Sequence, residues 1–224
     1  MTRGLFSTRM LFTYPDKGPE TTLKELRHYL PGMEVRVLRQ IHSDRIVNAD
    51  DIRGSEIPEA DAIISSDRTK VLCIRTADCV PILACSLDGT YTGAIHAGWK
   101  GLSLDIVEKA LDAMKSLGAK DIRVFIGPAI GPCCYQVGPD VLDRMKGIAR
   151  TRNGHGAYYL DLWDAAVSQA RNAGIPRHMI QVTKICTSCY NELFHSYRRD
   201  GHASGRNISL IGEGAWLLPG LRVG

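Results

Sequence analysis

The chain has 224 residues, with 28 lysines and arginines against 24 aspartates and glutamates, which gives a formal net charge of +4. Apolar residues make up 44% and charged residues 23%, which excludes a disordered or fibrous chain. A chain of this length buries about 70% of its unfolded surface on folding, so it forms a core without a disulfide scaffold. With no linker or repeat in it, we expect one domain over residues 1–224.

Three classes of protein are disfavoured by simple features. The longest apolar stretches fall far short of the ~20 residues that a membrane helix needs. Arg9 interrupts the segment where a secretory signal would be apolar. Basic residues are scattered, whereas nucleic-acid binders concentrate them in one stripe. Because seven cysteines without a signal indicate a reducing compartment, we expect a cytoplasmic protein with no nucleic-acid or membrane partner.

Short strands are predicted along most of the chain. Residues 34–39 alternate with a period of two, as a half-buried strand does, and several short apolar runs follow. Asp88-Gly89 lies between two of these runs and predicts an antiparallel hairpin. The predicted strands are 34–39, 60–64, 71–74, 81–85, 90–95, 122–126 and 179–185.

Three helices are predicted among these strands. Ser103 is a suitable N-cap for a helix that runs to about Leu117 and ends at Gly118. Further helices are expected over 139–145, with proline in the first turn, and over 161–173. The mixture of hairpins and helices, without a βαβ repeat, favours an α+β fold or a mixed sheet with helices outside.

Two histidines and one cysteine stand at the ends of predicted strands. His42, Cys79 and His96 form a donor set that suits zinc, and three ligands without a fourth suit a catalytic ion. A second hypothesis pairs Cys79 with either histidine as a thiolate–imidazole nucleophile. A third treats Cys79 as a core cysteine and the histidines as residues that cap strand ends.

Several loops contain further candidate residues. Gly98–Gly101, with Lys100, precedes a predicted helix and is either an anion site or a tight strand-to-helix turn. Residues 127–138 form a loop rich in glycine and proline, in which Tyr135 could stack on a planar ligand. It lacks the lysine and hydroxyl residue of a nucleotide-binding P-loop.

The C-terminal third holds a CxxC motif, Cys186-Thr187-Ser188-Cys189. No second CxxC exists to complete a tetrahedral site, and the adjacent pair Cys133-Cys134 is more often found in packing than in ligand sets. We therefore do not expect zinc or redox chemistry at this motif. The basic, aromatic loop over 194–206 is either an exposed loop or a binding site for an anionic or aromatic ligand.

Six motifs in order give the chain a family resemblance. It resembles the YfiH family, also called the laccase-domain or polyphenol oxidase family, which includes peptidoglycan editing factors and the mammalian protein FAMIN. The motifs are Gln40-Ile41-His42-Ser43, Thr76-Ala77-Asp78-Cys79-Val80-Pro81, His96-Ala97-Gly98-Trp99-Lys100-Gly101, Cys133-Cys134-Tyr135-Gln136-Val137-Gly138, Cys186-Thr187 and Phe194-His195-Ser196-Tyr197-Arg198-Arg199-Asp200-Gly201, together with the shorter Ala60-Asp61-Ala62 and Ile126-Gly127-Pro128. The chain departs from the family at Lys100, where arginine is usual, and at His195, where phenylalanine is frequent.

The resemblance implies a fold of mixed sheets in α/β/β/α layers, shared with a group of cysteine hydrolases. It implies phosphorolysis of adenosine, inosine, guanosine and methylthioadenosine, with adenosine deamination as a further activity. It also places zinc ligands at His42, Cys79 and His96. Two alternatives remain: a cysteine hydrolase that edits cell-wall precursors with Cys79 as its nucleophile, and a copper-dependent polyphenol oxidase, for which seven histidines are few.

Residues that would bind the nucleoside and phosphate are predicted from their position and charge. Gln40 and Ser43 flank His42 and are candidates to orient ligands or substrate. Positive charge suitable for phosphate is offered by Arg75, Lys100 and Arg206. Asp78 is expected to point away from the metal, because strand alternation turns neighbouring side chains to opposite faces.

Overall fold

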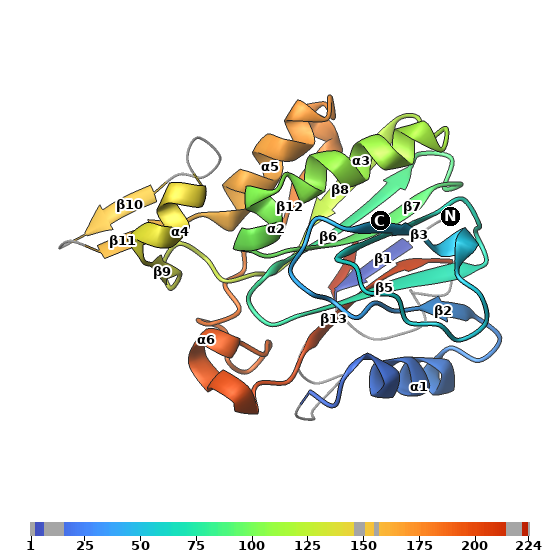
Figure 1. Cartoon of the computed structure of the whole chain (residues 1–224), viewed down its shortest axis with the longest axis horizontal. Coiled ribbons are helices and arrows are strands. Elements are labelled where there is room, and N and C mark those ends of the chain that lie inside the picture. Colours follow the sequence, from blue (N-terminus) through green and yellow to red (C-terminus); the bar gives the residue numbers. More distant parts are fainter. Residues whose placement is uncertain (1–2, 7–15, 146–150, 155–156, 214–220, 224) are drawn as a thin grey trace.

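Two mixed sheets stacked face to face form the centre of the molecule (Figure 1). The computed structural model describes residues 3–6, 16–145, 151–154, 157–213 and 221–223. The six-stranded sheet has the order β12 (Ile180–Val182), β8 (Ile122–Ile126), β6 (Val80–Ser86), β7 (Thr92–Ala97), β4 (Ala62–Ser65) and β3 (Ile46–Asn48). The five-stranded sheet has the order β14 (Leu221–Val223), β1 (Arg3–Phe6), β13 (Asn207–Gly212), β5 (Lys70–Thr76) and β2 (Glu34–Arg36).

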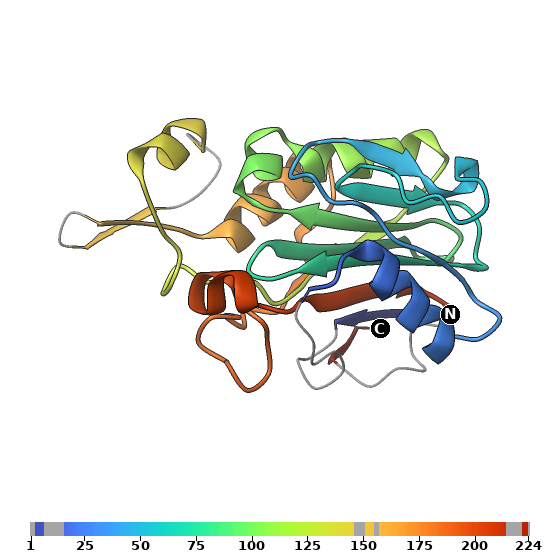
Figure 2. The same ribbon diagram turned by 60° about the horizontal axis from the view of Figure 1, so that its bottom comes forward.

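Helices cover the outer face of each sheet, as the turned view shows (Figure 2). Helices α2 (Trp99–Ser103), α3 (Ile106–Ser116) and α5 (Leu162–Asn172) pack on the six-stranded sheet, and α1 (Pro19–Tyr29) packs on the five-stranded one. A separate apolar cluster, with Ile63 and Leu83 from one sheet and Leu72 and Ile211 from the other, fills the space between them. The layering is therefore α/β/β/α, and the predicted α+β fold is confirmed.

A smaller sheet extends from one end of this sandwich (Figure 1). Its strands are β10 (Thr151–Gly154), β11 (Ala157–Leu160) and β9 (Gln136–Val137), with α4 (Pro139–Arg144) beside it. Helix α6 (Tyr197–Asp200) and the 3-10 turns η1 (Ala49–Asp51), η2 (Arg177–Met179) and η3 (Gly201–Ala203) complete the described elements. Within the described residues, no helix is long and apolar enough to span a membrane.

The hairpin predicted at Asp88-Gly89 is confirmed, and its register positions the site. Strands β6 and β7 pair antiparallel, with Val80 opposite Ala97 and Cys85 opposite Thr92. Every residue of both strands is buried, because the sheet is covered on both faces. The end of the hairpin opposite its turn therefore brings Cys79 next to the chain that leaves β7.

The helix predicted from Ser103 to Leu117 is two helices, and Ser103 does not cap it. Asp105 adopts a left-handed conformation with φ of 60°, which interrupts the helical hydrogen bonds between α2 and α3. The apolar spacing of three and four is the same on both sides of such a break, so the pattern alone does not reveal it. In α5 the prediction holds, since the Asp161 side chain accepts a hydrogen bond from the Asp164 amide at 3.0 Å.

Two predicted strands are longer than the real ones, and some elements were missed. Strand β2 ends at Arg36 and β12 ends at Val182. Beyond these residues the chain pairs with neighbouring loops only through isolated bridges, such as Arg39 with Glu59 and Cys186 with Ala129. No element was predicted over α1 or β13, although both belong to the core. Of residues 1–10, where Arg9 was expected to exclude a secretory signal, only residues 3–6 belong to the described part of the chain.

Candidate metal centre and pocket

The end of the β6–β7 hairpin brings two of the three predicted ligands together. Cys79 immediately precedes β6, and His96 lies on β7 opposite Pro81. Gly98 follows on the same side, and a Cβ atom built on it would lie 2.8 Å from the Cys79 sulfur. Glycine is therefore required here because it leaves room for the thiol, which favours the close-turn interpretation of Gly98.

His42 completes the cluster from a loop between β2 and β3. It has a φ of 59°, a left-handed conformation that is uncommon for a residue with a side chain. Its ring lies 4.9 Å from the ring of His96 at an interplanar angle of 82°. The ligand atoms of His42, Cys79 and His96 all lie within 4.8 Å of one another, so the chain brings the predicted set together.

A single buried carboxylate, that of Asp61, positions both histidines. Its Oδ1 accepts from Nδ1 of His96 at 2.8 Å and from the backbone amide of His42 at 2.9 Å. Its Oδ2 accepts from the amide and the hydroxyl of Ser43, at 2.6 and 2.8 Å. The carboxylate thereby leaves Nε2 of His96 free to face the thiol, an arrangement that fixes metal-binding histidines in proteins.

The electrostatics of the cluster favour a thiolate beside an imidazolium. Burial alone would raise the pKa of Cys79, but the charge of His96 and hydrogen bonds from both imidazoles lower it to about 6. Burial would lower the pKa of His96, but the Cys79 thiolate and Asp61 raise it to about 9. For Asp61 burial is again outweighed, here by hydrogen bonds from His96 and Ser43, and its pKa falls to about 2.

This donor set fits a single zinc ion. Two imidazoles and a thiolate are borderline-soft ligands that zinc prefers, and three protein donors leave a fourth position for a substrate. The carboxylate behind His96 is the outer partner that such sites use to orient a ligand. The same residues also form a Cys79–His96–Asp61 series, the arrangement that activates a cysteine nucleophile.

A pocket of about 480 Å³ adjoins the cluster, and all three ligands line it. This volume is in the range of small-molecule sites. Aromatic rings from Trp99, Tyr135 and Tyr197 line other parts of it, and the Arg198 guanidinium lies 5.2 Å from the centre of the Tyr135 ring. The pocket therefore combines candidate metal ligands with flat apolar surfaces and positive charge.

Three of the five predicted substrate-binding residues line this pocket: Gln40, Arg75 and Arg206. The Gln40 amide pairs with the backbone of Arg75 through hydrogen bonds of 2.7 and 2.9 Å. The two guanidinium groups share the carboxylate of Asp16, at 2.6 Å from Arg75 and 3.2 Å from Arg206. An anion-binding pair of arginines thus stands in the pocket wall.

The other two predicted residues lie elsewhere. Ser43 acts behind the ligands by donating to Asp61. Lys100 is exposed and is not among the residues that line the pocket; its ammonium lies 5.8 Å from the Trp99 ring centre. The α2 helix that contains it has only five residues.

Asp78 does not point away from the site, as strand alternation suggested. It precedes β6 in a turn, with φ of 87°, and its side chain lines the pocket. The buried carboxylate accepts from the Thr187 hydroxyl at 2.8 Å and from the Arg198 amide at 2.6 Å. Alternation failed because the residues between β5 and β6 are not strand.

Asp61 is the residue that sequence reasoning missed. It appears in one of the family motifs, yet no role was assigned to it. The signal that was available is an acidic residue that immediately precedes an apolar strand, because a carboxylate so placed needs buried donors.

The layered fold, the three possible metal ligands and the adjoining pocket together define a class of α+β proteins with a candidate metal site beside a small-molecule pocket. A family model described as multi-copper polyphenol oxidoreductase laccase matches residues 21–213. The chain belongs to this laccase-domain family, the YfiH family whose motifs it contains.

Curated relatives and solved structures agree with this assignment. The chain is 35% identical over 195 residues to a purine nucleoside phosphorylase of Clostridium acetobutylicum, covering 84% of this chain and 81% of that protein. Its fold is similar to that of the hypothetical protein YfiH of Bacillus licheniformis, with a TM-score of 0.82, 28% identity and coverage of 94% and 92%. A Neisseria meningitidis protein, NMB0706, gives a TM-score of 0.80 with 31% identity and coverage of 94% and 93%.

Proposed function

We propose that the chain is a zinc-dependent purine nucleoside phosphorylase of the reducing cytoplasm, which splits adenosine, inosine, guanosine and methylthioadenosine with phosphate. The observation that carries the proposal is the convergence of His42, Cys79 and His96 on a pocket that also presents aromatic rings and three arginines. The names of the relatives support the same reaction.

Phosphate is proposed to bind at Arg75 and Arg206. These guanidinium groups already hold one carboxylate between them, so a phosphate of greater charge can take the place of Asp16. Gln40 fixes the backbone of Arg75 and so sets where its side chain begins. The nucleophile is thereby oriented in the same pocket as the metal ligands.

The purine is proposed to stack on the aromatic part of the wall. Tyr135 is half-buried. Burial, and to a smaller extent the nearby charge of Cys79, raises the pKa of its hydroxyl well above the ordinary tyrosine value. Its hydroxyl therefore keeps its proton at neutral pH. That proton makes Tyr135 a candidate donor to the departing base.

In the reaction, a phosphate oxygen forms a bond to C1′ of the ribose as the bond from C1′ to the purine nitrogen breaks. The electron pair of that bond goes to the purine, which takes up a proton and leaves as the free base, with ribose 1-phosphate as the second product. Zinc at the three ligands would supply positive charge that polarises or orients the reacting oxygens. Deamination of adenosine, the second proposed activity, differs in that water rather than phosphate attacks, at C6 of the base.

The test is phosphate-dependent release of hypoxanthine from inosine by zinc-loaded protein. We expect release with phosphate and none without it, and loss of release after chelation with recovery on adding zinc. Adenosine without phosphate should yield inosine and ammonia if the second activity is present. No phosphate-dependent release from protein with measured zinc content would overturn the proposal.

A cysteine hydrolase is the second candidate, because the Cys79–His96–Asp61 series and the lowered pKa of the thiol suit a nucleophile. Hydrolysis of a muropeptide precursor that survives chelation but is lost in Cys79→Ala would favour it. Stoichiometric copper, with oxygen consumption on a phenol, would instead favour the oxidase alternative.

A further inference from the structure

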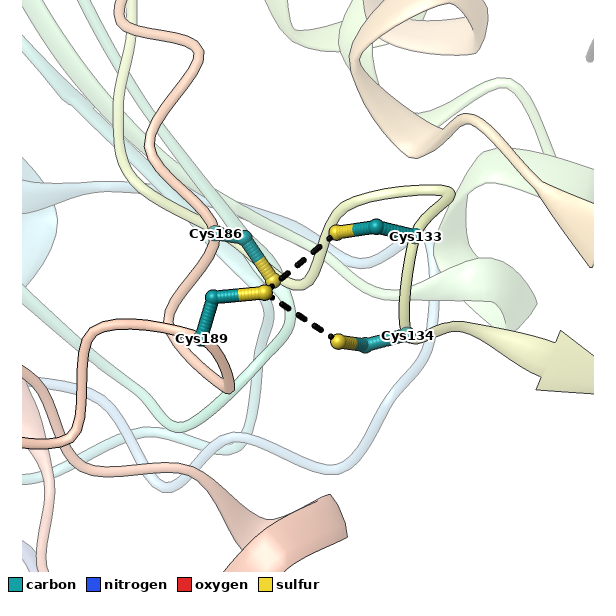
Figure 3. A group of neighbouring side chains, drawn as sticks. All are labelled: Cys133, Cys134, Cys186 and Cys189. Atoms are coloured by element: carbon teal, nitrogen blue, oxygen red, sulfur yellow. Dashed lines mark hydrogen bonds between the residues drawn. The ribbon is translucent and has the colours of Figure 1, made fainter.

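Four cysteines outside the pocket form a second cluster (Figure 3). The sulfur of Cys189 lies 3.5 Å from that of Cys133 and 3.4 Å from that of Cys134. With Cys186 included, all four sulfurs lie within 4.8 Å of one another, and none is in a disulfide. They point toward a common centre from two loops that are far apart in the sequence (Figure 3).

Backbone contacts hold these two loops together. One loop leads from β8 to β9 and holds Cys133 and Cys134; the other follows β12 and forms a turn in which the Tyr190 amide donates to the Cys186 carbonyl at 3.1 Å. The loops meet in a parallel bridge between Ala129 and Cys186. The sequence interpretation of the CxxC motif was incomplete, because the second pair of thiols comes from the adjacent Cys133-Cys134 and not from another CxxC.

We propose that these four thiolates bind a second metal ion, a structural Zn²⁺. Zinc–sulfur bonds of about 2.3 Å in a tetrahedron place the sulfurs ~3.8 Å apart. The observed separations of 3.4 and 3.5 Å, with none beyond 4.8 Å, are close to that value. An iron–sulfur cluster would hold several ions between the thiolates and so keep them farther apart. Four protein donors leave no position for a substrate, so the site is structural.

The surroundings of the cluster suit bound thiolates. The amide of Gly131 donates to the Cys186 sulfur at 3.2 Å, the kind of outer hydrogen bond that supports a metal ligand. The Arg199 guanidinium donates to the carbonyls of Thr187 and Ser188, at 3.0 and 3.3 Å, inside the CxxC turn. Arg198 donates to the Cys134 carbonyl at 3.1 Å. Arg199 is also paired with Asp200, at 2.7 Å, so it acts here mainly by fixing the turn. Arg198 brings a positive charge that offsets part of the net negative charge of four thiolates around one divalent ion.

The ion would fasten one wall of the pocket. Tyr135 directly follows Cys134, and Arg198 comes from the segment after the CxxC turn; both side chains line the pocket. Thr187, between the two cysteines of the turn, donates to Asp78 beside the ligand Cys79. The proposed role is therefore to lock the two loops in register, and each thiol releases its proton to solvent as it binds.

The experiment counts metal in protein that is reduced, freed of metal and reloaded with Zn²⁺. We expect two zinc ions per wild-type chain and one in Cys133→Ser/Cys189→Ser, which removes the two exposed thiols. The matched control, Ser188→Ala in the same turn, should keep two. His96→Ala should keep one, and Co²⁺ loaded into that variant should show the intense thiolate-to-metal absorption of a four-sulfur site.

The same zinc count in the wild type and in the double variant, whatever the total, would overturn the proposal. So would a disulfide among the four cysteines in freshly isolated protein, measured as a loss of titratable thiols. If the double variant does not fold, the cobalt spectrum of the His96→Ala protein decides. A spectrum that lacks the intense thiolate-to-metal absorption would show that the four thiols bind no ion. None of these measurements depends on phosphorylase activity, so the outcome is separate from that of the proposed function.

Discussion

The two clusters of metal-type ligands differ in donor number, donor type and setting. His42, Cys79 and His96 offer three mixed donors that line a pocket, whereas Cys133, Cys134, Cys186 and Cys189 offer four thiols that do not line it. The first set leaves a coordination position for a reactant and the second leaves none. If both proposals hold, ligand count and access separate a site for chemistry from a structural site within one chain.

The largest expected effect comes from removing one ligand of the first cluster. His96→Ala should lower kcat/KM for inosine by about a thousandfold or more, because a lost metal contact removes several kcal/mol of transition-state stabilisation. The Cys133→Ser/Cys189→Ser variant should lower kcat/KM by less than about tenfold, mainly by raising KM. This variant only loosens the pocket wall that holds Tyr135 and Arg198. Steady-state kinetics with measured metal content checks both. Equal losses in the two variants would remove the proposed distinction.

Asp61 tests how far the first cluster depends on its outer partner. Asp61→Ala should weaken zinc binding by about 10–100-fold, because His96 loses the carboxylate that orients it. It should also lower the free energy of unfolding of the metal-free protein by about 3–5 kcal/mol, since buried donors lose their acceptor. Zinc competition assays and urea unfolding measure the two effects.

The control for that variant is Asp112→Ala, whose exposed carboxylate also pairs with an exposed cation, Lys115. An exposed pair contributes about 0–1 kcal/mol, so this variant should keep both its zinc affinity and most of its stability. A loss of zinc affinity as large as that of Asp61→Ala would show that the effect is one of general stability.

A smaller effect is expected from filling the space beside the thiol. Gly98→Ala places a Cβ 2.8 Å from the Cys79 sulfur and should displace it, lowering zinc affinity about tenfold or more. Gly93→Ala is the matched control on the same hairpin, because its Cβ meets the flexible Met114 side chain and, at an ordinary 3.5 Å, Ile64, and neither is a candidate ligand. If both variants bind zinc like the wild type, the thiol has more freedom than the packing indicates.

The smallest effect concerns acid stability. Asp61 has a folded-state pKa of about 2, below the ordinary value of about 3.9, so its contribution to stability is present above pH ~4 and is lost as the pH falls toward 2. Urea unfolding of the metal-free protein between pH 5 and 2.5 should therefore show a slope that Asp61→Asn reduces. Asp67 and Asp88, with pKa values also near 2, should maintain the rest.

The core strands and the first ligand set could be predicted from the sequence because their signals are local. Residues 122–126 form β8 at the predicted bounds, and the Asp88-Gly89 turn gave the hairpin. The three ligands were predicted from residue type and family motifs, and their convergence needed the fold. By contrast, the left-handed Asp105 left no trace in the apolar spacing, so one helix was predicted where two exist.

The second cluster was not predicted because its ligand pattern is not contiguous. Cys186 and Cys189 have the spacing of a zinc ligand pair, but their partners lie more than fifty residues earlier as adjacent cysteines. Only the parallel bridge at Ala129 and Cys186 brings the pairs together, and such a bridge has no sequence signal of its own. Asp61 was missed for a similar reason, since its role depends on donors from two separate segments, the loop at His42 and Ser43 and the strand at His96.

The β6–β7 hairpin also has a consequence for the order of assembly. Cys79 and His96 lie on the two sides of one short antiparallel hairpin, at the end opposite its turn, and local strand pairing forms in microseconds once that turn closes. Two of the three donors can thus come together early in folding, from contacts of low sequence separation. His42 joins only when its loop docks on Asp61, so capture of the proposed ion by all three residues would report the completion of the fold.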